Sequence, residues 1–255
     1  MEDKRKNEAD LITGKNPVLE ALKAGRPINK IMLAQGLNQA SMKEISRLAK
    51  ERNIPYQLVE RKKLDSLAEK NTHQGIIAQT GVKEYVEWED IIENALQKGE
   101  DPLLLVLDNL EDPRNLGAIL RTTDAVGAHG LIIPKHRSVP LTVGVARSSA
   151  GAIEHVPVAR VTNLATTLER LKEKGCWIVG TDPQAEQNYF EADLKGPLAV
   201  VLGSEGKGIG RLVKEKCDFL VSIPMLGHVN SLNVSVAGAL LLYEITRQRG
   251  RFEKK

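Results

Sequence analysis

Short apolar runs alternate with helical patterns through residues 11–81 of the chain. The runs predict strands at residues 30–34, 56–59 and 75–79, because four to eight apolar or β-branched residues bounded by turn signals are typical of strands. Helices are predicted between and before them, at residues 17–24, 41–52 and 62–69. In the first helix Asn16 is the expected cap and Gly25 the expected end. Residues 11–81 are therefore predicted to form a small α/β unit.

The apolar runs after residue 102 are continuous rather than alternating. Leu103–Leu107 contains only Leu and Val, which is typical of a strand buried on both faces. Similar runs at residues 130–133, 177–180, 198–202 and 219–223 alternate with helical patterns, so a mostly parallel sheet is predicted. The acidic stretch 82–102 is interpreted as a linker between residues 11–81 and a second domain at 103–255. Residues 1–10 are expected to be a flexible tail.

The segment from Ile223 to Glu244 places a polar glycine loop directly before a nearly uncharged helix. Each of Ser231, Asn233 and Ser235 is a residue type that caps helix starts. Apolar or small residues then repeat at helical spacing, at Val234, Ala237, Gly238, Leu241, Leu242 and Ile245. The pattern predicts a ligand-binding loop that is backed by a deeply packed helix.

Composition narrows the class of protein. The chain has 255 residues, of which 42% are hydrophobic and 27% charged, and no apolar run approaches the roughly 18 residues of a membrane span. Because the N-terminus is charged and lacks a secretory signal, a cytoplasmic location without membrane insertion is expected. Cys176 and Cys217 are isolated and the five histidines are scattered. We therefore expect two buried thiols and no metal site.

Basic residues are concentrated in the first part of the chain. Residues 1–81 carry 15 Lys and Arg against 10 Asp and Glu, whereas the whole chain has a net charge of only +3. A local basic excess favours contact with phosphates, although solvated helix faces give the same count in many proteins that bind no nucleic acid.

A second polar loop follows the buried run at 103–107. Pro113 suits a first helical turn that Asp112 would cap. Gly117, Arg121 and Asp124 then share one helix face, so the glycine leaves room beside the arginine for another backbone or a ligand. An exposed ion pair between Arg121 and Asp124 is an equally acceptable interpretation.

A third loop, residues 201–210, contains four glycines after another apolar run. The phosphate-binding P-loop pattern fails because Val201 stands where its first glycine belongs, and the dinucleotide fingerprint fails because Arg211 replaces its last glycine. Glu205 suits a cationic or donor-bearing ligand better than an anion. All three loops follow predicted parallel strands, where open α/β sheets bind ligands, so one shared site is predicted. The alternative is that each loop is only a tight turn.

Three motifs together resemble those of the SpoU (TrmH-type) RNA ribose methyltransferases. They are Asn115-Leu-Gly-Ala-Ile-Leu-Arg121, Leu202-Gly-Ser-Glu-Gly206 and the segment from Ile223-Pro-Met to Asn230-Ser-Leu-Asn-Val-Ser235. The N-terminal segments Gly14–Leu22 and His73–Ile76 look like the substrate-binding domain of the same family, which resembles a ribosomal-protein type of RNA-binding fold.

The resemblance implies a knotted α/β methyltransferase domain, with a deep trefoil knot, that binds S-adenosylmethionine and forms a homodimer through the C-terminal domain. Knots are otherwise nearly absent from proteins. The positions that match the family's methyl-donor site are Gly203, Ile223 and Leu232, extended here to Ser204, Gly206, Met225 and Gly227. The positions that match its catalytic cluster are Asn115, Arg121, Glu205, Ser231 and Asn233.

The chemistry implied by the resemblance is methyl transfer to a ribose 2′-oxygen. Arg121 would stabilise the developing alkoxide and hold a neighbouring phosphate, since a guanidinium with a pKa above about 12 is a poor general base. Asn115 and Ser231 would orient the groups, while Glu205 and Asn233 would position Arg121 and the donor loop. The expected target is a guanosine in the peptidyl-transferase loop of large-subunit (23S) rRNA.

Three alternatives remain at this stage. One is a methyltransferase that acts on tRNA, and another is a ribosome-assembly factor that binds RNA but has lost the chemistry. The third is a nucleotide-dependent oxidoreductase, which has the same alternation of strands and helices but lacks the fingerprint glycines here.

Overall fold

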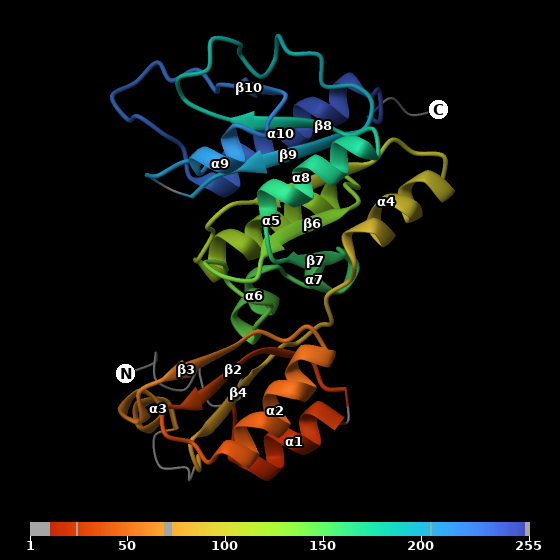
Figure 1. Cartoon of the computed structure of the whole chain (residues 1–255). Coiled ribbons are helices and arrows are strands. Elements are labelled where there is room, and N and C mark those ends of the chain that lie inside the picture. Colours follow the sequence, from red (N-terminus) through yellow and green to blue (C-terminus); the bar gives the residue numbers. More distant parts are fainter. Residues whose placement is uncertain (1–10, 24, 69–72, 205, 253–255) are drawn as a thin grey trace. The chain divides into compact units, whose positions relative to one another are not determined.

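A computed structural model describes residues 11–23, 25–68, 73–204 and 206–252 (Figure 1). The expected tail at residues 1–10 lies outside the described residues. The chain divides into two compact units. The first comprises Met1–Glu84 with Pro140–Gly144, and the second comprises Tyr85–Val139 with Val145–Lys255. We call them unit 1 and unit 2.

Unit 1 contains a four-stranded sheet in the order β1-β4-β2-β3. Strands β2 and β3 are parallel, while β4 runs antiparallel to both β1 and β2. The elements in chain order are β1 (Leu11–Thr13), α1 (Lys15–Lys23), β2 (Ile28–Ala34), α2 (Gln39–Glu51), β3 (Tyr56–Val59), α3 (Arg61–Ala68) and β4 (Ile76–Thr80).

The two faces of this sheet are covered by different helices. Ile31 and Leu33 of β2 pack with apolar residues of α1 and α2, such as Leu22. Met32 packs on the opposite face with Leu64 of α3, because successive strand residues point to opposite sides of a sheet. Unit 1 is therefore a small three-layer α/β domain.

Unit 2 contains six parallel strands in the order β10-β8-β9-β5-β6-β7, as the continuous apolar runs predict. The strands are β5 (Leu103–Leu107), β6 (Gly130–Pro134), β7 (Val158–Val161), β8 (Trp177–Thr181), β9 (Leu198–Leu202) and β10 (Phe219–Val221). The helices are α4 (Trp88–Gln97), α5 (Pro113–Ala125), α6 (Val143–Ser148), α7 (Ala152–His155), α8 (Leu164–Glu173), α9 (Arg211–Lys214) and α10 (Val234–Gln248).

Helices cover both faces of the unit 2 sheet. Leu104 and Val106 of β5 pack with residues of α4, α8 and α9 in one buried cluster. The alternate residues of the strands face the other side, where Gly238 of α10 lies so close to Leu202 that an added Cβ would be 2.8 Å from its Cδ1. Helix α10 in turn packs beside α5. Both helices therefore cover the face opposite α4 and α8.

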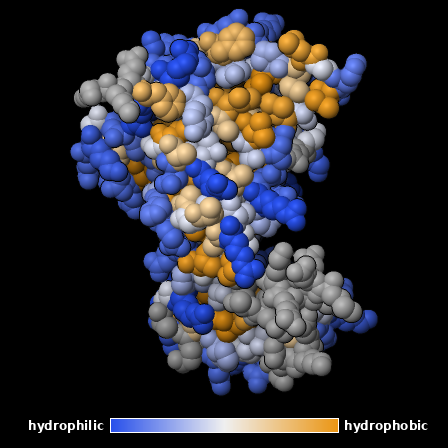
Figure 2. Space-filling model, turned by 180° about the vertical axis from the view of Figure 1, so that it is seen from behind, coloured by the Kyte–Doolittle hydropathy of each residue, from blue (hydrophilic) through white to orange (hydrophobic). Residues whose placement is uncertain are grey.

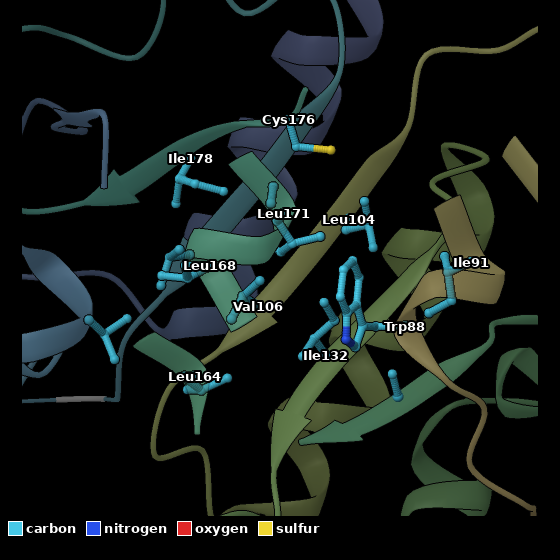
Figure 3. Packing of buried hydrophobic residues seen from close by; sticks show 14 of the residues in the cluster. Trp88, Ile91, Leu104, Val106, Ile132, Leu164, Leu168, Leu171, Cys176 and Ile178 are labelled. Carbon is cyan, nitrogen blue, oxygen red and sulfur yellow. The ribbon is translucent and has the colours of Figure 1, made fainter. Parts of the chain in front are cut away.

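Helix α4 corrects the prediction that residues 82–102 are a linker. Trp88 and Ile91 project from α4 toward Leu104 and Ile132 of the sheet (Figure 3), and unit 2 begins at Tyr85. The helix presents one apolar face to the core, while Glu89, Asp90 and Glu93 give the stretch its acidic composition. An amphipathic helix of unit 2 thus occupies the middle of the expected linker.

Most predicted elements lie within two residues of the observed ones, and β5, β9 and β3 have the predicted bounds. Helix α1 begins at Lys15 rather than after Asn16. The short strands β1 and β7 were not predicted. No helix within the described ranges is both long and apolar enough to cross a bilayer.

Replacement of the buried α4 tryptophan tests its place in the core. Because Trp88 is 4% exposed, we expect Trp88→Ala to lower the free energy of unfolding by about 3–5 kcal/mol, the usual cost of a buried Trp cavity. Chemical denaturation measures the change. Leu96→Ala is the matched control, since Leu96 lies on the same helix and is 58% exposed. Equal losses from both substitutions would contradict the placement of α4.

Candidate functional site

The three polar loops identified in the sequence leave the same edge of the unit 2 sheet. They follow β5, β9 and β10, and all six strands are parallel, so their carboxyl ends share one edge. Strands β5 and β9 are direct neighbours in register from Leu103 paired with Leu198 to Leu107 paired with Leu202. The first two loops therefore start side by side.

Asp108 joins the β5 loop to the β9 loop. Its amide donates to Leu202 O at 2.8 Å, and its Oδ2 accepts from the Gly210 amide at 2.7 Å. Its other oxygen accepts from Asn109 Nδ2 at 2.7 Å. Because Asp108 is buried, these bonds satisfy a carboxylate that would be costly to bury alone. Asp108 thus fixes where the glycine loop returns to the sheet.

The β9 loop folds back on itself as a tight hairpin. Ser204 and Gly208 exchange two backbone hydrogen bonds, of 3.1 and 2.9 Å. Gly203 has no room for a side chain, since a Cβ would lie 2.0 Å from Gly208 C. By contrast, a Cβ on Gly206 or Gly208 would meet no atom within 4 Å. Gly203 allows the hairpin to close, and the tip beyond it borders open space.

Asp182 at the end of β8 secures the helix that follows this hairpin. Its carboxylate forms an ion pair with Lys214 of α9. The hydrogen bond that Lys214 donates in this pair is the main cause that lowers the pKa of Asp182. Asp182 therefore stays ionised at neutral pH, and the ion pair holds α9 at the same edge of the sheet.

Helix α5 starts as the sequence predicts. Asp112 accepts from the Arg114 amide at 2.7 Å, and Pro113 occupies the first turn. Gly117 is buried against α6, because a Cβ there would be 2.0 Å from Ser148 Oγ. Ser148 Oγ donates to Pro113 O at 3.0 Å. The space beside Gly117 is therefore filled by Ser148 and its backbone, which leaves no room there for a ligand.

Arg121 lies two turns along α5 with its side chain exposed. The alternative ion pair with Asp124 is not formed in the described part of the chain, and no hydrogen bond there involves the Arg121 guanidinium. An exposed cation at this position is available to an anionic ligand.

Asn233 connects the third loop to the first. Its Oδ1 accepts from the Ser235 amide at 2.9 Å, so Asn233 is the cap of α10. Its Nδ2 donates to Asn115 Oδ1 on α5 at 3.0 Å, across 118 positions of sequence. One amide side chain therefore both starts the buried helix and binds the neighbouring motif. Ser231 and Ser235, the other cap candidates, do not cap the helix.

The remaining predicted site residues belong to the loops that follow β9 and β10. Ile223, Met225, Leu232 and Ser204 are half-buried, whereas Gly227 and Ser231 are exposed. Leu226 is 100% exposed and Val229 is 63% exposed, so the loop between β10 and α10 presents apolar side chains to solvent. Glu205 lies outside the described residues. The structure joins Asn115 and Asn233 by a hydrogen bond, but within the described residues no hydrogen bond joins Arg121 to either one.

Asp108 and Ser148 are site residues that the sequence interpretation missed. Asp108 had a usable signal, because a carboxylate directly after a fully apolar strand is expected to hold a neighbouring loop. Ser148 had none, since its role depends on the approach of α6 to Gly117 across 31 positions of sequence.

Comparisons with known proteins give a consistent result. A family model described as the SpoU rRNA Methylase family matches residues 102–243. A second model, described as RNA 2'-O ribose methyltransferase substrate binding, matches residues 11–86. The Bacillus subtilis (strain 168) protein YacO, which carries the name of a TrmH family tRNA/rRNA methyltransferase, is 54% identical over 240 residues. These cover 94% of this chain and 96% of YacO.

Two solved structures add to the comparison. The SpoU methyltransferase AviRb from Streptomyces viridochromogenes, crystallised with the cofactor AdoMet, has a TM-score of 0.61 and 25% identity, and the match covers 98% of this chain and 95% of AviRb. The TrmH/SpoU tRNA modifying enzyme of A. aeolicus has a TM-score of 0.54 and 31% identity. That match covers 63% of this chain and 85% of the enzyme.

A pair of glycine substitutions tests the hairpin. We expect Gly203→Ala to open the β9 loop and to destabilise the protein by about 1–3 kcal/mol, because its Cβ collides with backbone. Hydrogen exchange would then show lost protection of the Ser204 and Gly208 amides. Gly227→Ala is the matched control, since its Cβ meets nothing within 4 Å. Unchanged protection in Gly203→Ala would refute the close approach.

Proposed function

The chain belongs to the SpoU rRNA Methylase family, and from this premise we propose that it transfers a methyl group from S-adenosylmethionine to a ribose 2′-oxygen of RNA. The observation that carries the proposal is the bond between Asn233 and Asn115. It unites two motifs far apart in the sequence at the sheet edge where the glycine hairpin also lies.

The methyl donor fits the loops around β9 and β10. Open space borders Gly206, Gly208 and Gly227, and Ile223, Met225 and Leu232 are half-buried apolar residues beside exposed backbone. Such a lining suits an adenosyl group held by backbone amides and apolar contacts. Gly203 and Ser204 shape the hairpin that completes this site. When bound, the donor supplies a methyl group on a positively charged sulfur.

The chain's own residues supply alignment and charge stabilisation. Arg121 stabilises the negative charge that develops on the 2′-oxygen, and its guanidinium also suits an adjacent phosphate. Asn115 orients the ribose, while Asn233 holds Asn115 and the donor loop in register. Ser231, in the loop after β10, assists Asn115 in orienting the ribose. Glu205 is assigned to the positioning of Arg121. The hydroxyl proton leaves to solvent or to another group, because Arg121 is too weak a base to accept it.

The presence of unit 1 favours rRNA over tRNA as the substrate. The A. aeolicus tRNA modifying enzyme corresponds to only 63% of this chain, whereas the substrate-binding model spans residues 11–86. The two N-terminal motif segments lie together, since Gly14 N donates to Ile76 O at 2.9 Å and Lys15 N to Gln74 Oε1 at 3.3 Å. We assign the target to a guanosine in the peptidyl-transferase loop of 23S rRNA, which places the activity in the cytoplasm. Methylation of tRNA is the alternative.

Unit 1 also contains a histidine whose tautomer is defined by its contacts. His73 Nδ1 accepts from the Gly75 amide at 3.0 Å, so the ring proton lies on Nε2 and is donated to Asp65 at 2.8 Å. His73 is buried, and the two bonds fix the turn that precedes β4. The turn keeps Gln74 exposed beside the half-buried Lys15, and Gln74 is accessible to RNA there.

A homodimer through α10 completes the proposal. Val236, Leu240 and Tyr243 are 46%, 37% and 48% exposed and fall on one face of a helix whose other face is buried. The Tyr243 ring stacks on Phe252 at 5.6 Å between centroids. Unit 2 also exposes groups of apolar side chains, which are orange in Figure 2. An unpaired apolar face of this kind marks an interface. The trefoil knot that accompanies this dimer in the family stays a prediction.

Methyl transfer is tested with labelled S-adenosylmethionine and unmodified 23S rRNA or tRNA. We expect label in rRNA, at a guanosine ribose, and a loss of about 100-fold or more in rate with Arg121→Ala, because one charge-stabilising donor is worth that much. Binding of S-adenosylmethionine to the variant should be unchanged. Nuclease digestion and mass spectrometry locate the methylated nucleotide.

Arg170→Ala is the control for this experiment, because Arg170 is an exposed arginine of unit 2 on α8, on the sheet face opposite α5. Its guanidinium pairs with Glu89 and lies 5.1 Å from the centre of the Trp88 ring. It should retain full activity. Label in tRNA alone would overturn the rRNA assignment, and near-normal transfer by Arg121→Ala would overturn the role of Arg121.

The dimer is tested by Tyr243→Asp, which places a charge in the proposed interface. Sedimentation should show a shift from dimer to monomer, because an unpaired buried charge opposes association. Leu96→Asp adds the same charge at an exposed apolar site on α4 and should leave the mass unchanged. A monomeric wild-type protein would contradict the proposed homodimer.

A further inference from the structure

A fourth loop at the carboxyl edge of the unit 2 sheet has no role in the site described above. It consists of residues 135–138, Lys-His-Arg-Ser, which follow β6; we call it the β6 loop. His136 and Arg137 are exposed, and Lys135 is half-buried. The loop therefore presents a cluster of basic side chains at the edge where the motif loops lie.

The β6 loop is held to its neighbours on both sides. On one side Val139 N donates to Leu110 O of the β5 loop at 2.8 Å, and on the other Lys135 N donates to Val161 O at 2.8 Å. Ser138 Oγ also bonds to Pro134 O within the loop. These bonds make the β6 loop a structural neighbour of the segment that leads into α5 and Arg121.

A half-buried arginine of β7 binds the backbone of the β6 loop. Arg160 Nη2 donates to Lys135 O at 3.2 Å, and its guanidinium lies 5.0 Å from the centre of the Tyr85 ring. Burial lowers the pKa of Arg160, which records the cost of desolvating this cation. Arg160 thus holds the loop backbone through Lys135 O, while His136 and Arg137 of the loop itself are exposed.

The backbone at Arg137 is unusual. Its φ is 58°, a left-handed conformation that costs a non-glycine residue of order 1 kcal/mol. Glycine would adopt the same turn at no such cost. Glycine would suit the fold better at this position. The presence of an arginine is therefore explained if its side chain has a function.

The sheet order decides what the β6 loop faces. The donor loops follow β9 and β10, which both lie on one side of β5, whereas β6 lies on the other side. Methyl transfer needs the attacking oxygen in line with the sulfur and the methyl group. The ribose therefore approaches from the side away from the donor loops, which is the side of the β6 loop.

We propose that Lys135, His136 and Arg137 bind the backbone phosphates of the RNA strand that carries the target ribose, with Arg137 as the main contact. The inference rests on the proposed function, because it takes RNA as the substrate. Lys and Arg on an ordered loop hold phosphates without reading the base. The β6 loop thus sets how far the strand enters the site, while Arg121 acts at the reacting ribose.

Arg137→Gly tests the proposal, because it removes the cation and relieves the backbone strain, so the fold is retained. We expect about tenfold weaker binding of 23S rRNA and a salt dependence whose log–log slope falls by about one. Binding of S-adenosylmethionine should not change. Arg137→Lys, which keeps the charge, should restore most of the affinity. Filter binding at several salt concentrations measures each quantity.

Lys98→Ala is the matched control. Lys98 is an exposed cation of unit 2 that precedes β5, at the opposite edge of the sheet. It should bind RNA as the wild type does. Wild-type affinity and salt slope in Arg137→Gly would overturn the proposal, as would an equal loss in Lys98→Ala. If the wild-type protein bound rRNA without methylating it, the proposed function would fail, but the comparison of variants would still decide the role of the β6 loop.

Discussion

The parallel pairing of β5 with β9 is the constraint on which the rest of the site depends. It brings Leu107 opposite Leu202, so the next residue of β5, Asp108, is placed where its carboxylate meets the Gly210 amide. A shift of one residue would turn Asp108 to the other face of the sheet and leave both groups unpaired. Because both strands are fully apolar, burial keeps them inside the sheet, while the bonds of Asp108 to Leu202 and Gly210 favour the observed register, and the polar loops take their positions from it.

Close packing also sets the spacing of the helices that carry the motifs. Gly238 lets α10 lie against Leu202, and α10 then packs beside α5. Only at that separation does Asn233, the cap of α10, reach Asn115. The cap therefore has two functions, since it satisfies the helix start and sets the spacing of two motifs. Arg121 is an exposed residue of the same α5. It therefore sits on a helix rather than on a loop, and a helix is better suited to align a reacting group.

Much of this architecture could be predicted from the sequence, for identifiable reasons. The bounds of β5 and β9 follow from continuous apolar runs, and Asp112 and Pro113 identify the start of α5. Helix α4 was missed because Glu89, Asp90 and Glu93 dominate its composition and conceal the apolar face of Trp88 and Ile91. The contact between Asn115 and Asn233 could not be read from spacing, because it depends on how two helices pack across 118 positions. The motif resemblance grouped these residues, and the structure supplied their geometry.

The interpretation of Gly117 shows how far local reasoning reaches. Its helical spacing from Arg121 predicted room for another backbone or a ligand, and Ser148 of α6 with its backbone occupies that room, so the glycine serves the packing of α6 against α5. Gly203 likewise serves chain packing, whereas Gly206 and Gly208 border open space. Glycines at a site are therefore of two kinds, and sequence alone does not separate them. What separates them is whether a Cβ would meet the protein's own backbone or solvent. At this edge only the second kind leaves room for a ligand.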